Sequence, residues 1–114
     1  MKDNIIIEKT LNFAVRIVNL YKYLCKEKNE HIMSKQLLRS GTSVGANVKE
    51  AEYGQSKADF ISKMSIALKE TSETGYWLEL LYKTEYLTEE QYKSIENDYA
   101  ELMKLLTNIV KNSK

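Results

Sequence analysis

The scarcity of chain-breaking residues limits the possible folds most strongly. Proline is absent, and glycine occurs only four times in 114 residues. An all-β sandwich or barrel needs a turn about every ten residues, and glycine and proline are the residues that best make such turns. With 43% hydrophobic and 29% charged residues, the composition is that of a globular protein and not of a disordered one. We therefore expect a globular domain built from helices.

Apolar residues recur at helical spacing in four segments, which we predict to span about 4–28, 34–53, 57–85 and 89–112. The first segment carries two adjoining apolar stripes, and this width indicates contact with more than one neighbour. The two stripes are Ile7, Leu11, Ala14, Val18, Tyr21 and Cys25, and beside them Phe13, Ile17, Leu20 and Leu24.

Glycines and capping residues mark how these helices begin, end and pack. Gly41 and Gly45 lie four residues apart, so they share one helix face and favour close approach of another helix. Gly54 is expected to end the second helix in the left-handed conformation. Ser56, with Asp59 three residues later, is typical of an N-cap, and the run from Thr88 to Gln91 is a capping-box pattern.

Short connections between consecutive helices indicate antiparallel neighbours. We therefore predict one all-α domain over residues 1–114, an antiparallel up-down-up-down four-helix bundle. A lone bundle needs only one inward stripe per helix, but the first helix has two, and Ile66 and Trp77 lie off the main apolar face of the third. This surplus predicts a homo-oligomer.

Residues for catalysis or metal binding are scarce. Di-iron bundles need two Glu-x-x-His pairs and zinc sites need a Cys/His cluster, whereas His31 is the single histidine and Cys25 the single cysteine. No phosphate-binding glycine motif and no nucleophile–base spacing occurs. We expect a non-enzymatic protein without metal or cofactor. A single cysteine, no signal peptide and no membrane-spanning apolar run favour the cytoplasm.

Polar residues form a stripe beside the apolar face of the second and third helices. Helical geometry places four of them within about 80° on the second helix and four within about 60° on the third. In an antiparallel pair, Arg39 and Asn47 are expected to approach Glu70 and Glu73. Two interpretations stay open: a network that sets the register of the bundle or of a subunit interface, and a polar pocket that binds a small ligand. The stripe consists of Arg39, Ser43, Asn47 and Glu50, and of Ile66, Glu70, Glu73 and Trp77.

The charge is unevenly distributed, although the net charge is only +1. Residues 1–54 hold nine Lys and Arg against six Asp and Glu, and residues 55–114 hold eight against ten. Solvated helix faces account for charge runs of this size. An oligomer that repeats the first half around a ring would instead gather a basic surface that binds RNA or DNA weakly. The candidate nucleic-acid contacts are Lys22, Lys26, Lys28, Lys35 and Lys49.

Two blocks carry a family resemblance: QLLRSGTSVGANVKEA at 36–51 and FISKMSIALKETSETGYWL at 60–78. They resemble the "four helix bundle protein" family, first noticed as reading frames in intervening sequences of bacterial large-subunit ribosomal RNA genes and sometimes labelled S23 ribosomal protein. The family motif matches at Arg39, Ser43, Asn47, Glu50, Glu73 and Trp77.

This resemblance implies an antiparallel four-helix bundle that assembles as a ring-like homopentamer. It also implies kinship with the accessory variability protein of diversity-generating retroelements, a basic pentamer that binds nucleic acid and a reverse transcriptase. We therefore expect an oligomeric assembly or scaffold protein for a ribonucleoprotein or another protein, with weak RNA binding. The alternative is a purely structural oligomer whose polar pocket binds a small ligand.

Overall fold

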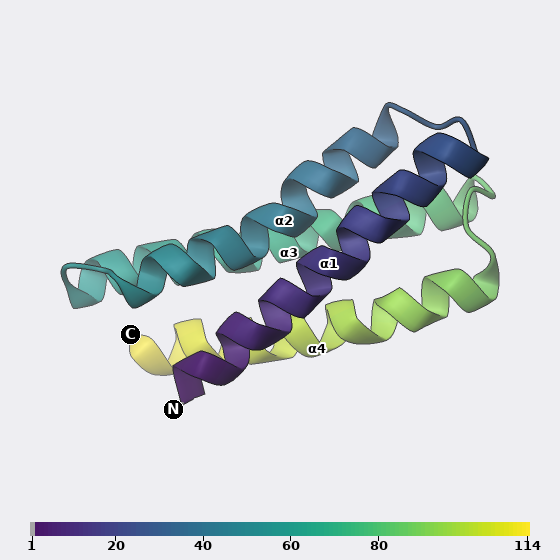
Figure 1. Cartoon of the computed structure of the whole chain (residues 1–114). Coiled ribbons are helices and arrows are strands. Elements are labelled where there is room, and N and C mark those ends of the chain that lie inside the picture. Colours follow the sequence, from purple (N-terminus) through teal and green to yellow (C-terminus); the bar gives the residue numbers. More distant parts are fainter. Residues whose placement is uncertain (1) are drawn as a thin grey trace.

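The computed structural model describes residues 2–114, with side chains from Ile5 onward, so Met1 of the predicted domain lies outside it. Four helices follow one another: α1 (Lys2–Glu27), α2 (Met33–Glu52), α3 (Lys57–Lys83) and α4 (Glu89–Ser113). Each runs antiparallel to the one before it, and together they form an elongated bundle of 44 × 20 × 20 Å (Figure 1). The predicted all-α up-down-up-down bundle is confirmed.

The helix starts follow the predicted capping residues. Ser56 Oγ accepts a hydrogen bond from Asp59 N at 3.0 Å, which satisfies one free N–H at the start of α3. At the start of α4, Thr88 Oγ1 accepts from Gln91 N at 3.1 Å, while Gln91 Oε1 accepts from Thr88 N at 2.9 Å. This reciprocal pair is the predicted capping box.

The prediction that Gly54 takes the left-handed conformation is wrong, because no glycine in the described chain has a positive φ. Gly54 N donates to Ala51 O at 3.0 Å, and a Cβ at residue 54 would lie 3.1 Å from that same oxygen and 3.3 Å from Phe60 N. Glycine therefore lets the chain pass closely between α2 and α3. Positive φ occurs instead at Asn29 (53°) and Glu85 (70°), in the other two connections.

The core takes one of the two apolar stripes of α1. Phe13, Ile17 and Leu24 are fully buried, whereas Leu11, from the other stripe, is 62% exposed. The position of α2 decides between the stripes, because Gly41 lies against Ile17: a Cβ at residue 41 would come within 2.8 Å of Ile17 Cγ1. The stripe that begins with Ile7 and Leu11 is left at the edge of the α1–α2 contact.

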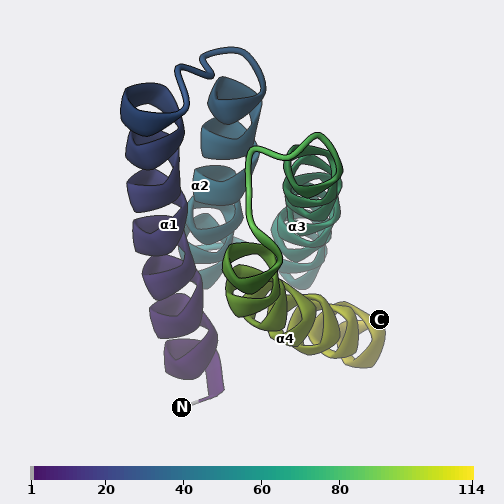
Figure 2. The same cartoon turned by 90° about the vertical axis from the view of Figure 1, so that its right-hand side faces the viewer.

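Ion pairs join α1, the first helix, to α4, the last helix. Arg16 Nη1 lies 2.8 Å from Asp98 Oδ2, and Lys9 Nζ lies 2.9 Å from Glu101 Oε2. Figure 2 shows α4 running obliquely to α1, so the two helices diverge along their length. None of the described helices is long and apolar enough to cross a membrane.

Candidate functional site

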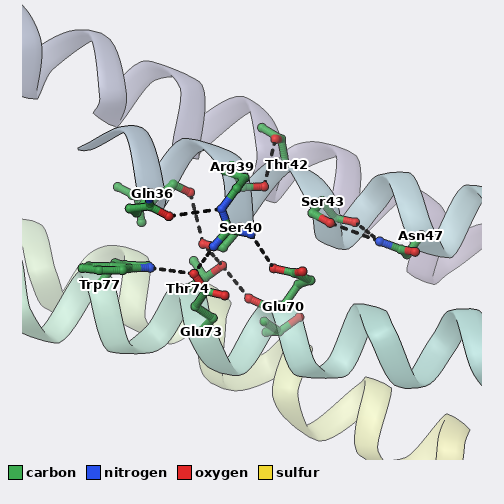
Figure 3. Close-up of polar contacts among 12 residues, drawn as sticks. Gln36, Arg39, Ser40, Thr42, Ser43, Asn47, Glu70, Glu73, Thr74 and Trp77 are labelled. Atoms are coloured by element: carbon green, nitrogen blue, oxygen red, sulfur yellow. Dashed lines mark hydrogen bonds and ion pairs between the residues drawn. The ribbon is translucent and has the colours of Figure 1, made fainter. Parts of the chain in front are cut away.

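A polar network joins α2 to α3 at the predicted stripe (Figure 3). Arg39 Nη1 donates to Glu70 Oε1 at 3.3 Å, Arg39 Nη2 pairs with Glu73 Oε2, and Arg39 Nε donates to Gln36 Oε1 at 3.2 Å. The indole N–H of Trp77 donates to the same Glu73 oxygen at 2.9 Å. One arginine is thus held by two carboxylates, and the aromatic ring fixes one of them.

Two buried hydroxyls lie beneath this network. Thr74 Oγ1 is 2.9 Å from Ser40 Oγ and 2.8 Å from Glu70 O, and both side chains are fully buried. These hydroxyls satisfy each other across the α2–α3 contact, which is how buried polar groups avoid a desolvation cost. The sequence analysis missed this pair, although Ser40 and Thr74 both lie on the core-facing side of their helices.

The rest of the predicted stripe lies apart from the network. Asn47 Nδ2 donates to Ser43 O at 2.9 Å and lies 3.1 Å from Ser43 Oγ, within α2 itself. The expectation that Asn47 approaches the glutamates is therefore wrong, because Asn47 lies two helical turns beyond Arg39. Glu50 pairs with Lys63 Nζ at 3.1 Å, one turn further along. The structure brings together Arg39, Glu70, Glu73 and Trp77 only.

The network is only partly shielded from water. The Arg39 side chain is 49% exposed, against 20% for Glu70 and 36% for Glu73. The hollows described below are lined by residues other than Arg39, and the bonds of Arg39 orient α2 on α3.

The candidate nucleic-acid lysines separate into two places. Lys22, Lys26, Lys28 and Lys35 are exposed and lie where α1 passes into α2. Lys49 lies near the other end of α2, roughly 21 Å from Lys35 along the helix axis at 1.5 Å per residue. Its Nζ is 3.8 Å from Glu52 Oε1 and 5.9 Å from the centre of the Tyr53 ring. Only the first four form one group, which we call the lysine end.

Glu30 occupies the start of α2 and was missed by the sequence analysis. Its carboxylate is buried and accepts hydrogen bonds from the backbone N–H groups of Ile32 (3.1 Å), Met33 (3.0 Å) and Ser34 (2.7 Å). Burial raises the pKa of this carboxyl, but the N–H donors of Met33, Ser34 and Ile32 together outweigh it and hold the pKa below its usual value. An acidic residue just before a helix is the signal that would have found this cap.

An apolar groove runs along the outer side of the α1–α2 contact. It encloses about 310 Å³, and nearly all of its lining is apolar. Leu11 in the groove is 62% exposed and Val15, beside it on α1, is 52% exposed. The groove is lined by Ile7, Thr10, Leu11 and Ala14 of α1 and by Thr42, Gly45, Ala46 and Lys49 of α2.

Cys25 and His31 lie where α1 passes into α2, beside the Glu30 cap and the lysine end. Cys25 Sγ is half-buried, 3.8 Å from Ser34 Oγ, and the exposed His31 ring lies 2.8 Å from Asn29 Oδ1. Over residues 2–114, no three His, Cys, Asp or Glu side chains gather in a way that would hold a metal ion.

Comparison with known proteins places these features in a family. The family model described as "23S rRNA-intervening sequence protein" matches residues 2–108. A crystal structure of a protein of unknown function from the S23 ribosomal protein family of Bacteroides thetaiotaomicron is 65% identical, with a TM-score of 0.95. That match covers 97% of this chain and 99% of the other. None of the curated proteins matches.

Proposed function

The chain belongs to the 23S rRNA-intervening sequence protein family, and from that premise we propose that it is a cytoplasmic, non-enzymatic homo-oligomer that acts as an assembly or scaffold protein. The similar crystal structure is that of a protein of unknown function from the S23 ribosomal protein family. The partner assembled on it would be a ribonucleoprotein or another protein.

The observation that carries this proposal is the apolar surface that the single chain leaves uncovered. The α1–α2 groove exposes Leu11, Val15 is exposed beside the groove on α1, and α3 exposes Ile66 (39%) and Tyr76 (58%) elsewhere on the surface. Contiguous apolar surface of this kind marks interaction sites. Two unlike patches on one chain suit a head-to-tail contact, which closes into a ring when the rotation between neighbours allows. The resemblance of the two sequence blocks to ring-forming proteins leads us to propose a pentamer.

The groove provides a direct test of this assembly. Leu11→Lys places a charge in the apolar groove, whereas Asn12→Lys places the same charge on an exposed neighbouring position of α1 outside it. We expect Leu11→Lys to lower the native mass measured by light scattering and Asn12→Lys to leave it unchanged. Equal native masses for the two variants would show that the groove is not part of the assembly interface.

A second function, weak nucleic-acid binding, is favoured by the lysine end. No ion pair between the described side chains, those of residues 5–114, involves Lys22, Lys26, Lys28 or Lys35. Glu30, which the sequence places among them, turns its carboxylate inward onto the start of α2. Four lysines repeated around a ring would give a positive field that attracts phosphates.

The alternative of a ligand pocket at the polar stripe has less support. The hollows described in this molecule are lined by other residues, and the stripe residues bond to one another. We therefore assign Arg39, Glu70, Glu73 and Trp77 a structural part in the proposed scaffold.

A further inference from the structure

A hollow lies where α1 and α4 diverge. It encloses about 550 Å³ and is open to solvent on one side. This size is in the range of pockets that hold small organic molecules. We call it the α1–α4 recess, and it is lined by Arg16, Asn19 and Leu20 of α1 and by Glu90, Gln91, Ser94 and Ile95 of α4.

The positive charge in the recess belongs to the guanidinium of Arg16, which is already paired within the protein. Arg16 Nη1 pairs with Asp98 Oδ2 at 2.8 Å and donates to Ser94 O at 3.2 Å, while Nη2 donates to Ser94 Oγ at 2.8 Å. This set of bonds satisfies both ends of the guanidinium fork, so Arg16 forms a wall of the recess with its charge balanced.

The negative charge in the recess is not balanced in this way. Among the side chains of residues 5–114, Glu90 takes part in no ion pair, and its exposed side chain lies in the first turn of α4. The neighbouring acid, Glu89, is paired with Lys93 at 2.8 Å and lies outside the recess. Glu90 is thus the one lining group whose charge is free to meet a ligand.

The remaining lining residues provide an apolar floor and polar sides. Leu20 is half-buried and Ile95 is buried, so they present hydrocarbon surface at the base. Asn19 and Gln91 add side-chain amides at the edge. A carboxylate and hydrocarbon surface that line the same recess are together complementary to a cation that carries a hydrocarbon group.

We propose that the α1–α4 recess binds a small organic ammonium ion with an apolar body, with Glu90 holding the ammonium group and Leu20 and Ile95 contacting the hydrocarbon. This site lies between α1 and α4, away from the apolar groove between α1 and α2, so the proposal is independent of the assembly function. A ligand bound there contacts both α1 and α4 and so adds a bridge at the seam closed by Arg16 and Lys9.

Three six-carbon probes that differ only in their head group test the site. The full-length ¹⁵N-labelled protein is titrated with hexylammonium, with 1-hexanol and with hexanoate, and the backbone amide shifts are followed by NMR. We expect hexylammonium to shift amides in 16–20 and 90–95 at millimolar concentration, 1-hexanol to bind about threefold more weakly, and hexanoate to produce no saturable shift there. A threefold preference is what an ion pair exposed to water contributes.

Matched variants identify the group responsible. Glu90→Gln should make hexylammonium and 1-hexanol bind equally, whereas Glu89→Gln, the same change one residue away, should keep the threefold preference. Both positions are exposed, so both variants are expected to fold. Saturable hexanoate binding at 16–20 and 90–95, an unchanged preference in Glu90→Gln, or shifts spread over the whole surface would overturn the proposal.

Discussion

The carboxylate of Glu30 accepts a hydrogen bond from the backbone N–H of Ser34 at 2.7 Å and caps the start of α2 from a position before the helix. Because the folded state holds the pKa of Glu30 below its usual value, this carboxylate stabilises the fold above the unfolded pKa of about 4.3. That contribution is lost as the pH falls through the folded pKa. We expect Glu30→Ala to lower the free energy of unfolding at pH 7 by about 1–2 kcal/mol.

Urea unfolding from pH 7 down to pH 3 checks this prediction. The difference in the free energy of unfolding between the wild type and Glu30→Ala should shrink as the carboxylate becomes protonated. The two curves of stability against pH therefore converge at low pH. Glu27→Ala, an exposed neighbour in the last turn of α1, is the control and should cost less than about 0.5 kcal/mol. A constant difference between wild type and Glu30→Ala at every pH would contradict the capping role.

Gly41 and Gly45 should respond in opposite ways to a methyl group. A Cβ at residue 41 would lie 2.8 Å from two carbons of the buried Ile17, so Gly41→Ala should cost about 1–3 kcal/mol through overpacking. A Cβ at residue 45 would meet Thr10 at 3.4 Å, an ordinary contact, so Gly45→Ala should gain up to about 1 kcal/mol of helix propensity. Thermal unfolding separates the two, and Gly41→Ala should cost less in an Ile17→Ala background, which removes both of these carbons.

The ion pairs of Arg39 should contribute a modest stability. Its side chain is 49% exposed, so water and salt screen it, and we expect Arg39→Ala to cost about 1 kcal/mol in denaturant unfolding. The cost should shrink at high salt and largely disappear in the background of Glu73→Ala. A loss of 2–4 kcal/mol would indicate a desolvated pair. A loss below about 0.3 kcal/mol would show that the network does not stabilise α2 against α3.

The lysine end should determine nucleic-acid binding. Four phosphate contacts predict that the affinity for single-stranded RNA falls roughly 50-fold between about 50 and 200 mM salt. Replacing Lys22, Lys26 and Lys28 by glutamine should weaken retention and flatten this salt dependence. The same charge change at the exposed Lys69, Lys104 and Lys111 should have much less effect. Equal weakening by both triple variants would assign the binding to net charge alone.

The fold could be predicted well because its determinants are local. Helical spacing gave boundaries within two residues at each end, and Ser56 and Thr88 cap the helices as their sequence patterns indicate. The two stripes of α1 could not be ranked from sequence, because both are apolar and the choice depends on where Gly41 meets Ile17.

The site could be predicted only in part, because a helical wheel gives the direction in which a side chain points and not its position along the helix axis. Arg39 and Asn47 point the same way from α2, yet only Arg39 lies level with Glu70 and Glu73. Lys49 was grouped with Lys35 because both belong to the basic first half of the sequence, yet it lies near the other end of the helix. Glu30 was missed because it lies four residues before the predicted start of the second helix, so its one signal was an acidic residue close before that helix.

Sedimentation equilibrium of the wild-type chain at micromolar concentration tests the proposed assembly most directly. Each chain has a mass of 13.3 kDa. A homo-oligomeric scaffold predicts a single species several times heavier, five chains for the proposed pentamer, which becomes lighter in Leu11→Lys and not in Asn12→Lys. A mass of one chain at that concentration would contradict the account, because the exposed groove of α1 and α2 would then have no second copy to cover it.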